Sequence, residues 1–480
     1  MEGPEGMECA CAEQGGRLYL GLTRGMCREC RTTCEARYVA DEGGVWLERR
    51  CPTHGVGRAL VAETLPWYLD AMRQPGAARP PEHPRPRTTA CPGSCGPCAF
   101  HGQRCQLPVF SITNACDLRC PICFTYNRPD QRWFMSAADF TRHLDYVLAA
   151  TGGVDLVNLT GGEPTTHPDL LALLALARRP GIGRVTVNSN GLRLAREPDL
   201  CRALADLGVY VILSLDTLDP ATSVRMHGRD ITTEKRRALD NLARAGVSTT
   251  LLMVLAADVN EGELGAVVDL AMTTDTVRSL TIQTMTYTGQ GGGAFTPRRH
   301  IPVEGVERRL EEATAGRLAR AAFVPLPTAH PLCYGVAYLL VDGDGGLCSF
   351  TDLLGRPALA AHLADGYLLH PTAALESELR DAIDRLWSEG RGPALLAALK
   401  DLLRRLYPTG ETLTVHERQR RAERAVKTVY VHAHMDEDTW EAGRAMRCPD
   451  QVPVDAERLV GACNYNLFYR QSDSRFWVAP

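Results

Sequence analysis

The 480-residue sequence predicts an α/β protein whose centre is a partial (β/α)6 TIM-like barrel. Two observations predict this fold class. Between residues 107 and 284, six short apolar or β-branched runs alternate with amphipathic helical patterns. Of the 18 cysteines, 13 lie in the first 123 residues, ahead of or just inside the first of these units. We therefore expect a Cys-rich metal-binding region before the barrel and a region with further cysteines after it.

Strand–helix alternation repeated six times indicates a parallel sheet with right-handed crossovers. The active site of such a barrel lies at the carboxyl ends of its strands. After the barrel we expect a strand at Ala337–Val341 and a helical region over 370–427. The predicted barrel strands are Leu107–Thr113, Asp155–Thr160, Arg184–Asn188, Val209–Leu215, Ser248–Leu255 and Ser279–Thr284. The predicted helices are Ser136–Ala150, with Ser136 as N-cap, Pro168–Ala177, Asp199–Leu207, Thr233–Ala245 and Glu261–Met272.

Composition and charge narrow the class of protein further. Charged residues make up 23% of the chain and the net charge is −4, which does not favour nucleic-acid binding. The chain shows neither a signal peptide nor a stretch long enough to span a membrane, so we expect a cytoplasmic protein with reduced thiols. Many cysteines in a reduced chain indicate metal sites. The expected domains are 1–73, metal-binding; 74–106, a Pro-rich linker with a cluster segment; 107–325, the barrel; and 326–480.

The sequence Cys116-Asp-Leu-Arg-Cys120-Pro-Ile-Cys123-Phe124 follows the first barrel strand directly. Three thiolates within eight residues can hold three irons of a [4Fe–4S] cluster, and the fourth iron is then open to a ligand. The alternatives are a structural zinc knuckle or part of a four-cysteine cluster. The position at the mouth of a barrel favours the open cluster.

This loop resembles the cluster motif of the radical S-adenosylmethionine (SAM) superfamily, and further motifs follow in the order found there. Thr160-Gly161-Gly162-Glu163-Pro164 follows the second strand and resembles the GGEP motif, whose backbone and Glu contact the methionine amino group. Asn188-Ser189-Asn190 and Ser214-Leu215-Asp216 follow the third and fourth strands and are similar to positions that hold the ribose and carboxylate of SAM. The resemblance therefore implies these cofactor-binding residues: Phe124, Gly161, Gly162, Glu163, Pro164, Asn188, Ser189, Asn190, Ser214 and Asp216.

A second set of cysteines lies near the N-terminus. Cys27-Arg-Glu-Cys30 and Cys51-Pro-Thr-His54-Gly form two knuckles of two ligands each, a spacing suited to one Zn²⁺ or one iron. The second knuckle resembles that of rubredoxin, with His54 in the last place. Cys34 or Cys9 are alternatives to His54 as the fourth ligand.

A third set, Cys91, Cys95, Cys98 and Cys105, suits an auxiliary [4Fe–4S] cluster just before the barrel, with a second zinc site as the alternative. The remaining cysteines, Cys333, Cys348, Cys448 and Cys463, would each read alone as buried core residues. The whole layout resembles the branch that contains archaeal tetraether lipid synthase and the class D radical SAM methylases. That resemblance implies a C-terminal cluster held by these four cysteines, and hence three [4Fe–4S] clusters and one mononuclear Fe or Zn.

The resemblance also implies the activity. Such an enzyme reductively cleaves SAM to a 5′-deoxyadenosyl radical, which abstracts hydrogen from an unactivated carbon before a C–C bond forms. We expect a small-molecule or lipid-like substrate and a low-potential electron donor such as ferredoxin or flavodoxin. One alternative is a class D-like C-methyltransferase acting on a small heteroaromatic or natural-product substrate. A different class, an iron–sulfur electron-transfer module or a zinc-ribbon nucleic-acid binder, is disfavoured by the GGEP turn and the barrel pattern.

Overall fold

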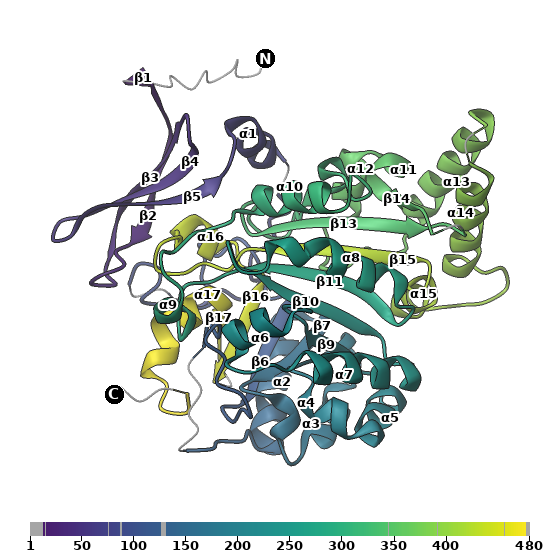
Figure 1. The fold of residues 1–480 in the computed structure, drawn as a ribbon, viewed down its shortest axis with the longest axis horizontal. Coiled ribbons are helices and arrows are strands. Elements are labelled where there is room, and N and C mark those ends of the chain that lie inside the picture. The colour runs from purple at the N-terminus through teal and green to yellow at the C-terminus, as the bar shows by residue number, and fades with distance from the viewer. Residues whose placement is uncertain are drawn as a thin grey trace.

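The computed structural model describes residues 13–14, 16–74, 76–86, 89–125, 131–343, 345–390, 392–455 and 457–476. Two sheets organise these residues, a five-stranded sheet near the N-terminus and a twelve-stranded sheet that forms the barrel. Figure 1 shows the small sheet standing beside the barrel, whose helices lie on its outer side. Cys9 and Cys11 lie outside the described residues.

The N-terminal sheet is antiparallel, with its strands in chain order from β1 to β5. Val45 and Leu47 of β4 are fully buried, and Tyr38 of β3 packs with Tyr68 of the following helix α1. This small core is separate from that of the barrel. The elements are β1 (Glu13–Gln14), β2 (Arg17–Met26), β3 (Thr33–Asp41), β4 (Gly44–Cys51), β5 (Gly55–Ala62) and α1 (Leu65–Arg73).

The six predicted barrel strands are confirmed, and they lie side by side in chain order as parallel neighbours. Ser136 is the N-cap of helix α2, accepting a hydrogen bond from the Asp139 N–H at 3.0 Å. The strands are β6 (Leu107–Thr113), β7 (Val154–Gly161), β8 (Ile182–Ser189), β9 (Tyr210–Ser214), β10 (Thr249–Leu255) and β11 (Val277–Thr284). The helices are α2 (Ala137–Thr151), α3 (Leu170–Ala177), α4 (Leu192–Arg196), α5 (Pro198–Asp206), α6 (Pro220–His227), α7 (Thr232–Ala245) and α8 (Leu264–Thr273).

Strands from beyond residue 325 extend this sheet at both edges. Strand β15 (Val426–His432) runs parallel to β11, and β13 (Tyr334–Val341) runs antiparallel to β15. At the other edge β16 (Asp450–Asp455) pairs with β6. The sheet therefore crosses the boundary that the sequence places between barrel and C-terminal region. The sequence pattern does not predict β15 as part of this sheet, because its partners β13 and β11 lie about 90 and 150 residues earlier in the chain.

The remaining elements complete the C-terminal region. Helix α14 (Pro393–Leu406) buries Leu399 and Leu402, as its leucine spacing predicts. In the described part of the chain no helix is long and apolar enough to cross a membrane. The other elements are α9 (Gly291–Ala294), α10 (Val303–Ala313), β12 (Val324–Pro325), β14 (Leu347–Ser349), α11 (Phe350–Leu354), α12 (Arg356–His362), α13 (Ala373–Ser388), α15 (Val415–Ala422), α16 (Ala442–Met446), β17 (Arg458–Gly461) and α17 (Ala462–Asn464).

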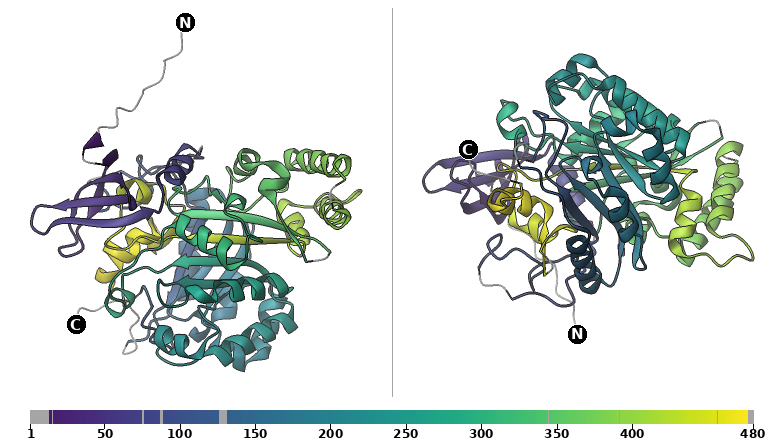
Figure 2. Two further views of the ribbon diagram at one scale, coloured as in Figure 1. Left: turned by 45° about the horizontal axis from the view of Figure 1, so that its top comes forward. Right: turned by 90° about the horizontal axis from the view of Figure 1, so that it is seen from below.

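The N-terminal sheet packs against the segment that follows β15. Arg49 of β4 is buried and donates to the Glu437 carbonyl at 2.7 Å and to the Asp438 carboxylate at 3.1 Å. Gly25 of β2 also forms a β-bridge with Glu441. In Figure 2 the purple N-terminal strands lie next to the yellow C-terminal segment in both views. The N-terminal sheet and the segment after β15 thus meet on one side of the barrel.

Candidate functional site

A cavity of about 460 Å³ occupies the interior of the barrel and opens at the predicted cysteine loop. Its size is in the range of small-molecule sites. Cys116, Cys120, Cys123 and Phe124 line it at one end. The structure thus brings the three predicted cluster cysteines to the carboxyl end of β6, where a barrel active site is expected.

The three cysteines of this loop are partly buried. Burial raises the pKa of Cys116 to about 12, and it raises that of Cys120 as well. Buried thiols lose protons only when a cation compensates for the lost solvation. An iron–sulfur cluster supplies such a charge, so the loop fits a cluster of which these three side chains would be the ligands.

The two glycines of the GGEP motif bring its turn against the cysteine loop. A Cβ on Gly161 would lie 2.2 Å from the Thr113 carbonyl oxygen, and one on Gly162 would lie 2.2 Å from that of Ala115. The Gly162 and Glu163 N–H groups donate to these same carbonyls at 2.8 and 2.7 Å. The backbone of the GGEP turn thus packs directly against the backbone of residues 113–115, and only glycine leaves room for this contact.

The Glu163 side chain is buried and fully occupied by hydrogen bonds. Its carboxylate accepts from the backbone and hydroxyl of Thr165, from the Ser189 hydroxyl at 2.9 Å and from the Asn190 N–H at 2.7 Å. Burial raises its pKa, and these donors oppose that effect. Glu163 therefore fastens the ends of β7 and β8 together. Its expected contact with the methionine ammonium remains a prediction.

The other predicted SAM residues gather at the same end of the cavity. The lining includes Gly161, Gly162, Glu163, Asn188, Ser189, Asn190, Ser214 and Asp216, whereas Pro164 is buried outside the lining. The buried Asn188 Oδ1 has no hydrogen-bond partner within the described part of the chain, so it is available to a ligand. Asn190 donates to the Asp117 carboxylate at 2.6 Å, which ties the third strand end to the cysteine loop.

Asp216 is held from two sides rather than pointing freely into the cavity. Its carboxylate accepts from the Val254 N–H at 2.8 Å and lies 2.9 Å from His227 Nε2. Burial raises the pKa of Asp216, but His227 and Lys235 outweigh this and leave it below its usual value. Asp216 and His227 therefore form the part of the cavity wall beside Ser214.

Two cationic residues of the site were missed by sequence reasoning. Lys235 in α7 is buried, its ammonium donates to the Ser214 carbonyl at 2.5 Å, and the charge of Cys120 acts on it. Arg470 lines the cavity and is 4% exposed, and its Nε and one Nη have no hydrogen-bond partner among the residues that the structure describes. A guanidinium near Cys123 with two such N–H groups suits a carboxylate. Only the fold places either one, since Lys235 reads as a helix-surface lysine.

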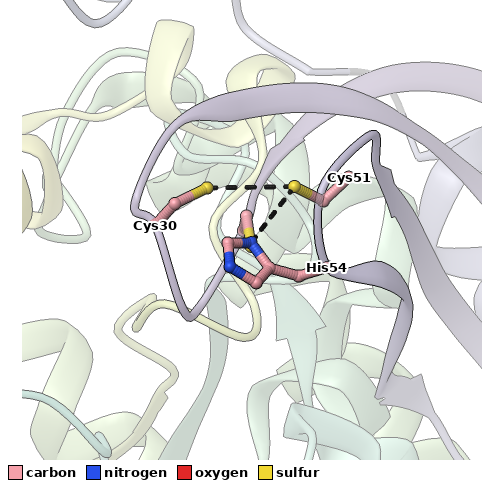
Figure 3. A group of neighbouring side chains, drawn as sticks. Cys30, Cys51 and His54 are labelled. Atoms are coloured by element: carbon pink, nitrogen blue, oxygen red, sulfur yellow. Dashed lines mark hydrogen bonds between the residues drawn. The ribbon is translucent and has the colours of Figure 1, made fainter.

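The N-terminal knuckles meet as expected. The ligand atoms of Cys27, Cys30, Cys51 and His54 all lie within 4.8 Å of one another. His54 Nδ1 is 3.5 Å from the sulfurs of both Cys27 and Cys51, and Figure 3 shows the His54 ring and the Cys30 and Cys51 sulfurs turned toward one another. Three sulfurs and one nitrogen at this spacing fit a tetrahedral zinc or iron site. Cys34 is buried nearby but is not part of this group.

The third cysteine set is only partly gathered. The Asn464 amide lies 3.7 Å from the Cys91 sulfur and 3.1 Å from that of Cys95, and Cys98 is close enough to Cys95 to raise its pKa beyond the effect of burial. Cys105 instead packs into the barrel core, where Asp450 is the charged group that acts on it. Its part in the auxiliary cluster remains a prediction.

Among the C-terminal cysteines, the structure groups three and separates the fourth. Burial and the neighbouring Cys333 and Cys463 raise the pKa of Cys448, and Arg444 donates to the Cys333 sulfur at 3.3 Å. Cys333 directly precedes β13, whereas Cys348 pairs with Leu340 near the other end of that strand. At the rise of a β-strand, the backbone at Leu340 is about 23 Å from Cys333. The expectation that Cys348 shares a cluster with the other three is wrong, because the length of β13 separates them.

His434 lies beside the three grouped cysteines. Its Nδ1 is 3.5 Å from the Cys463 sulfur, and its ring stacks on Phe124 at 5.6 Å. The segment around His434 therefore connects the C-terminal cysteines to the cysteine loop at the barrel mouth.

A second group with the chemistry of metal ligands, His300, Asp436 and Asp438, lies between the barrel and the N-terminal sheet. Arg49 and Arg298 already neutralise Asp438, and His300 lies 2.8 Å from Asp436. These carboxylates thus have protein partners, and the group serves as an ion-pair network.

Comparison with known proteins agrees with the family that the sequence motifs indicate. A family model described as the Radical SAM superfamily matches residues 110–271. GTP 3′,8-cyclase of Edwardsiella ictaluri is 32% identical over 50% of this chain and 73% of its own length. The chain belongs to the radical SAM superfamily.

Further relatives of this radical SAM enzyme differ in how much they share with it. The 7,8-dihydro-6-hydroxymethylpterin dimethyltransferase of Methanocaldococcus jannaschii is 22% identical over 95% of this chain and 96% of its own length. The chain spans about half (52%) of the GTP 3′,8-cyclase of Chlorobaculum tepidum, at 34% identity over 36% of this chain. A model described as the HMPTM N-terminal zinc ribbon domain matches residues 19–63. Among solved structures, SuiB of Streptococcus suis bound to S-adenosylmethionine is 20% identical over 44% of this chain and 47% of that one, with a TM-score of 0.37.

Proposed function

We propose that this radical SAM enzyme is a C-methyltransferase whose substrate is a small, polar heteroaromatic ring of the pterin type. The lining of the barrel interior carries this proposal. Hydroxyl and amide side chains project into the cavity from successive strands: Ser111, Asn158, Thr160, Thr186, Thr250, Ser279, Thr281, Gln283 and Thr428. Burying an alkyl chain against them would cost their solvation without return, whereas a polar ring can exchange hydrogen bonds with them.

The similarity to a pterin dimethyltransferase over nearly the whole chain supports the same substrate class. We propose Cys116, Cys120 and Cys123 as ligands of the cluster that binds SAM, and we propose that the strand-end residues around Asn188 bind the cofactor. When bound, cluster and SAM supply the 5′-deoxyadenosyl radical that activates a C–H bond. The chain's own part is to hold the ring near the Cys123 end of the cavity and to keep water out.

The other cysteine sets enter the proposal as follows. We propose that Cys27, Cys30, Cys51 and His54 hold a mononuclear metal, and that the sets at Cys91, Cys95 and Cys98 and at Cys333, Cys448 and Cys463 serve auxiliary clusters. We further propose a low-potential donor such as ferredoxin or flavodoxin as the source of electrons.

One observation favours a second candidate, the coupling of a lipid-like chain. Leu402 and Leu406 of α14 line the cavity together with Leu368, Leu369 and Leu375. This apolar lining suits an alkyl group, whereas the hydroxyl and amide side chains that project from the strands do not.

The test uses the anaerobically reconstituted full chain with SAM, dithionite and 6-hydroxymethyl-7,8-dihydropterin. A carbon-13 methyl label is placed on SAM in one reaction and on a one-carbon-carrying folate in another. Mass spectrometry should show 5′-deoxyadenosine and a pterin that has gained a labelled methyl group. Cys120→Ala should abolish both products, whereas Cys201→Ala, a buried cysteine outside the cavity, should retain them. Release of 5′-deoxyadenosine with alkyl substrates alone would favour the second candidate instead.

A further inference from the structure

The carboxylate of Asp450 is buried in the wall of the cavity and is only half satisfied. Asp450 is the first residue of β16, is 4% exposed and lines the cavity. Its Oδ2 accepts a hydrogen bond from the Tyr334 hydroxyl. Its Oδ1 is buried and has no hydrogen-bond partner among the described residues. A buried acceptor without a donor is unfavourable, so this oxygen calls for a donor from a ligand.

A row of rings connects Asp450 with the cysteine loop. Tyr334 stacks on His432 with ring centroids 3.9 Å apart, and His432 lies 4.0 Å from His434. His434 stacks on Phe124, which follows Cys123. All four rings line the cavity, and together we call them the aromatic wall. A flat ring that lies on such a wall keeps its edge free for polar contacts.

We propose that Asp450 recognises the N–H edge of the substrate ring, with Oδ1 accepting a hydrogen bond from the exocyclic amine. The 2-amino-4-oxopyrimidine ring, with a ring N–H beside an exocyclic amine, is the chemical class that fits. This inference rests on the proposed function, which places a heteroaromatic ring in the same cavity. Because Oδ2 already accepts from Tyr334, Oδ1 is the oxygen left to accept from a ligand, and the site therefore favours rings that present a donor.

The surroundings of Asp450 support this role. His432 Nε2 is 3.7 Å from Oδ2, on the oxygen that Tyr334 already occupies. The backbone of Asp450 is held by the pairing of β16 with β6, in which Asp450 lies opposite Leu107. The side chain is therefore held in place with one oxygen toward the cavity. An alkyl chain would leave that oxygen without a donor.

The experiment compares two rings that differ only at the edge in question. Anaerobic equilibrium dialysis of the cluster-loaded full chain measures binding of 6-hydroxymethylpterin and of 6-hydroxymethyl-lumazine, in which an oxo group replaces the amine. The wild type should bind the pterin at least about tenfold more tightly, because the lumazine lacks the amine that donates to Oδ1 and leaves this buried acceptor unpaired. In Asp450→Asn the side-chain amide can donate to the oxo group, so this preference should shrink or invert.

A matched control and the outcomes complete the test. Glu307→Gln alters another buried carboxylate, which accepts from the Trp67 indole at 3.0 Å outside the cavity, and it should keep the wild-type preference. If Asp450→Asn keeps the full preference for the pterin while the wild type methylates it, the role of Asp450 is overturned and the proposed function stands. If the wild type binds neither ring, both proposals fail.

Discussion

The contact between the GGEP turn and the cysteine loop leads to a prediction for Gly162→Ala. A Cβ at this position would lie 2.2 and 2.7 Å from the Ala115 carbonyl oxygen and carbon, and 2.8 Å from the Asn114 oxygen. All three are backbone atoms, so no side chain can move aside. The two loops must separate, and Ala115 precedes Cys116, so the shift reaches the cluster ligands directly.

Overpacking of this kind costs about 1–3 kcal/mol. If the cost falls on the arrangement that binds SAM, the affinity drops about 5- to 150-fold, since 1.4 kcal/mol corresponds to a factor of ten. Anaerobic equilibrium dialysis with labelled SAM measures the affinity, and iron and sulfide analysis reports whether the cluster is still present.

The matched control is Gly262→Ala, because an added Cβ there meets nothing within 4 Å. This variant should bind SAM and iron like the wild type. A Gly162→Ala protein with unchanged SAM affinity and full iron content would refute the argument that the close approach of the two loops shapes the cofactor site.

Three further predictions concern other parts of the molecule. Lys235→Met removes a buried positive charge near Cys120, so it should lower the midpoint potential of the cluster in an EPR-monitored redox titration. The control is Lys427→Met, which changes a buried lysine that donates to carbonyls of α8 and β11 and should leave the potential unchanged. His54→Ala should lose the N-terminal metal in elemental analysis, while Cys34→Ala should keep it; the reverse result would make Cys34 the ligand. Burial raises the pKa of Asp436, but His300 outweighs this and holds it below its usual value, so Asp436→Asn should cost about 3–5 kcal/mol at neutral pH. Denaturant unfolding should show this difference shrinking as the pH falls below about 4 toward the folded-state pKa, and a constant difference would contradict the assignment.

The sequence predicted those parts of the site that local patterns encode. The cysteine loop, the GGEP turn and the polar strand ends each occupy a few consecutive residues, and the parallel sheet brings their positions together automatically. The knuckles of Cys27, Cys30, Cys51 and His54 are local in the same way, because two hairpin turns carry them.

The parts that were not predicted depend on contacts between distant segments. Cys348 resembles the other C-terminal cysteines in sequence, yet the length of β13 decides its position. The roles of Arg470 and Asp450 depend on a cavity whose walls come partly from barrel strands more than 150 positions earlier. No spacing rule along the chain reveals that such side chains are buried with some of their polar atoms unpaired.

The pairing of β16 with β6, which covers one edge of the barrel sheet, has a consequence for biosynthesis. The edge of β6 is covered by β16, and Asp450 and Arg470 seal the same side of the cavity. These segments leave the ribosome about 330 to 350 residues after the cysteine loop has emerged. A nascent chain therefore carries the proposed iron ligands in an unfinished enclosure for most of its translation, so iron and sulfide can reach them before β16 closes this side of the barrel.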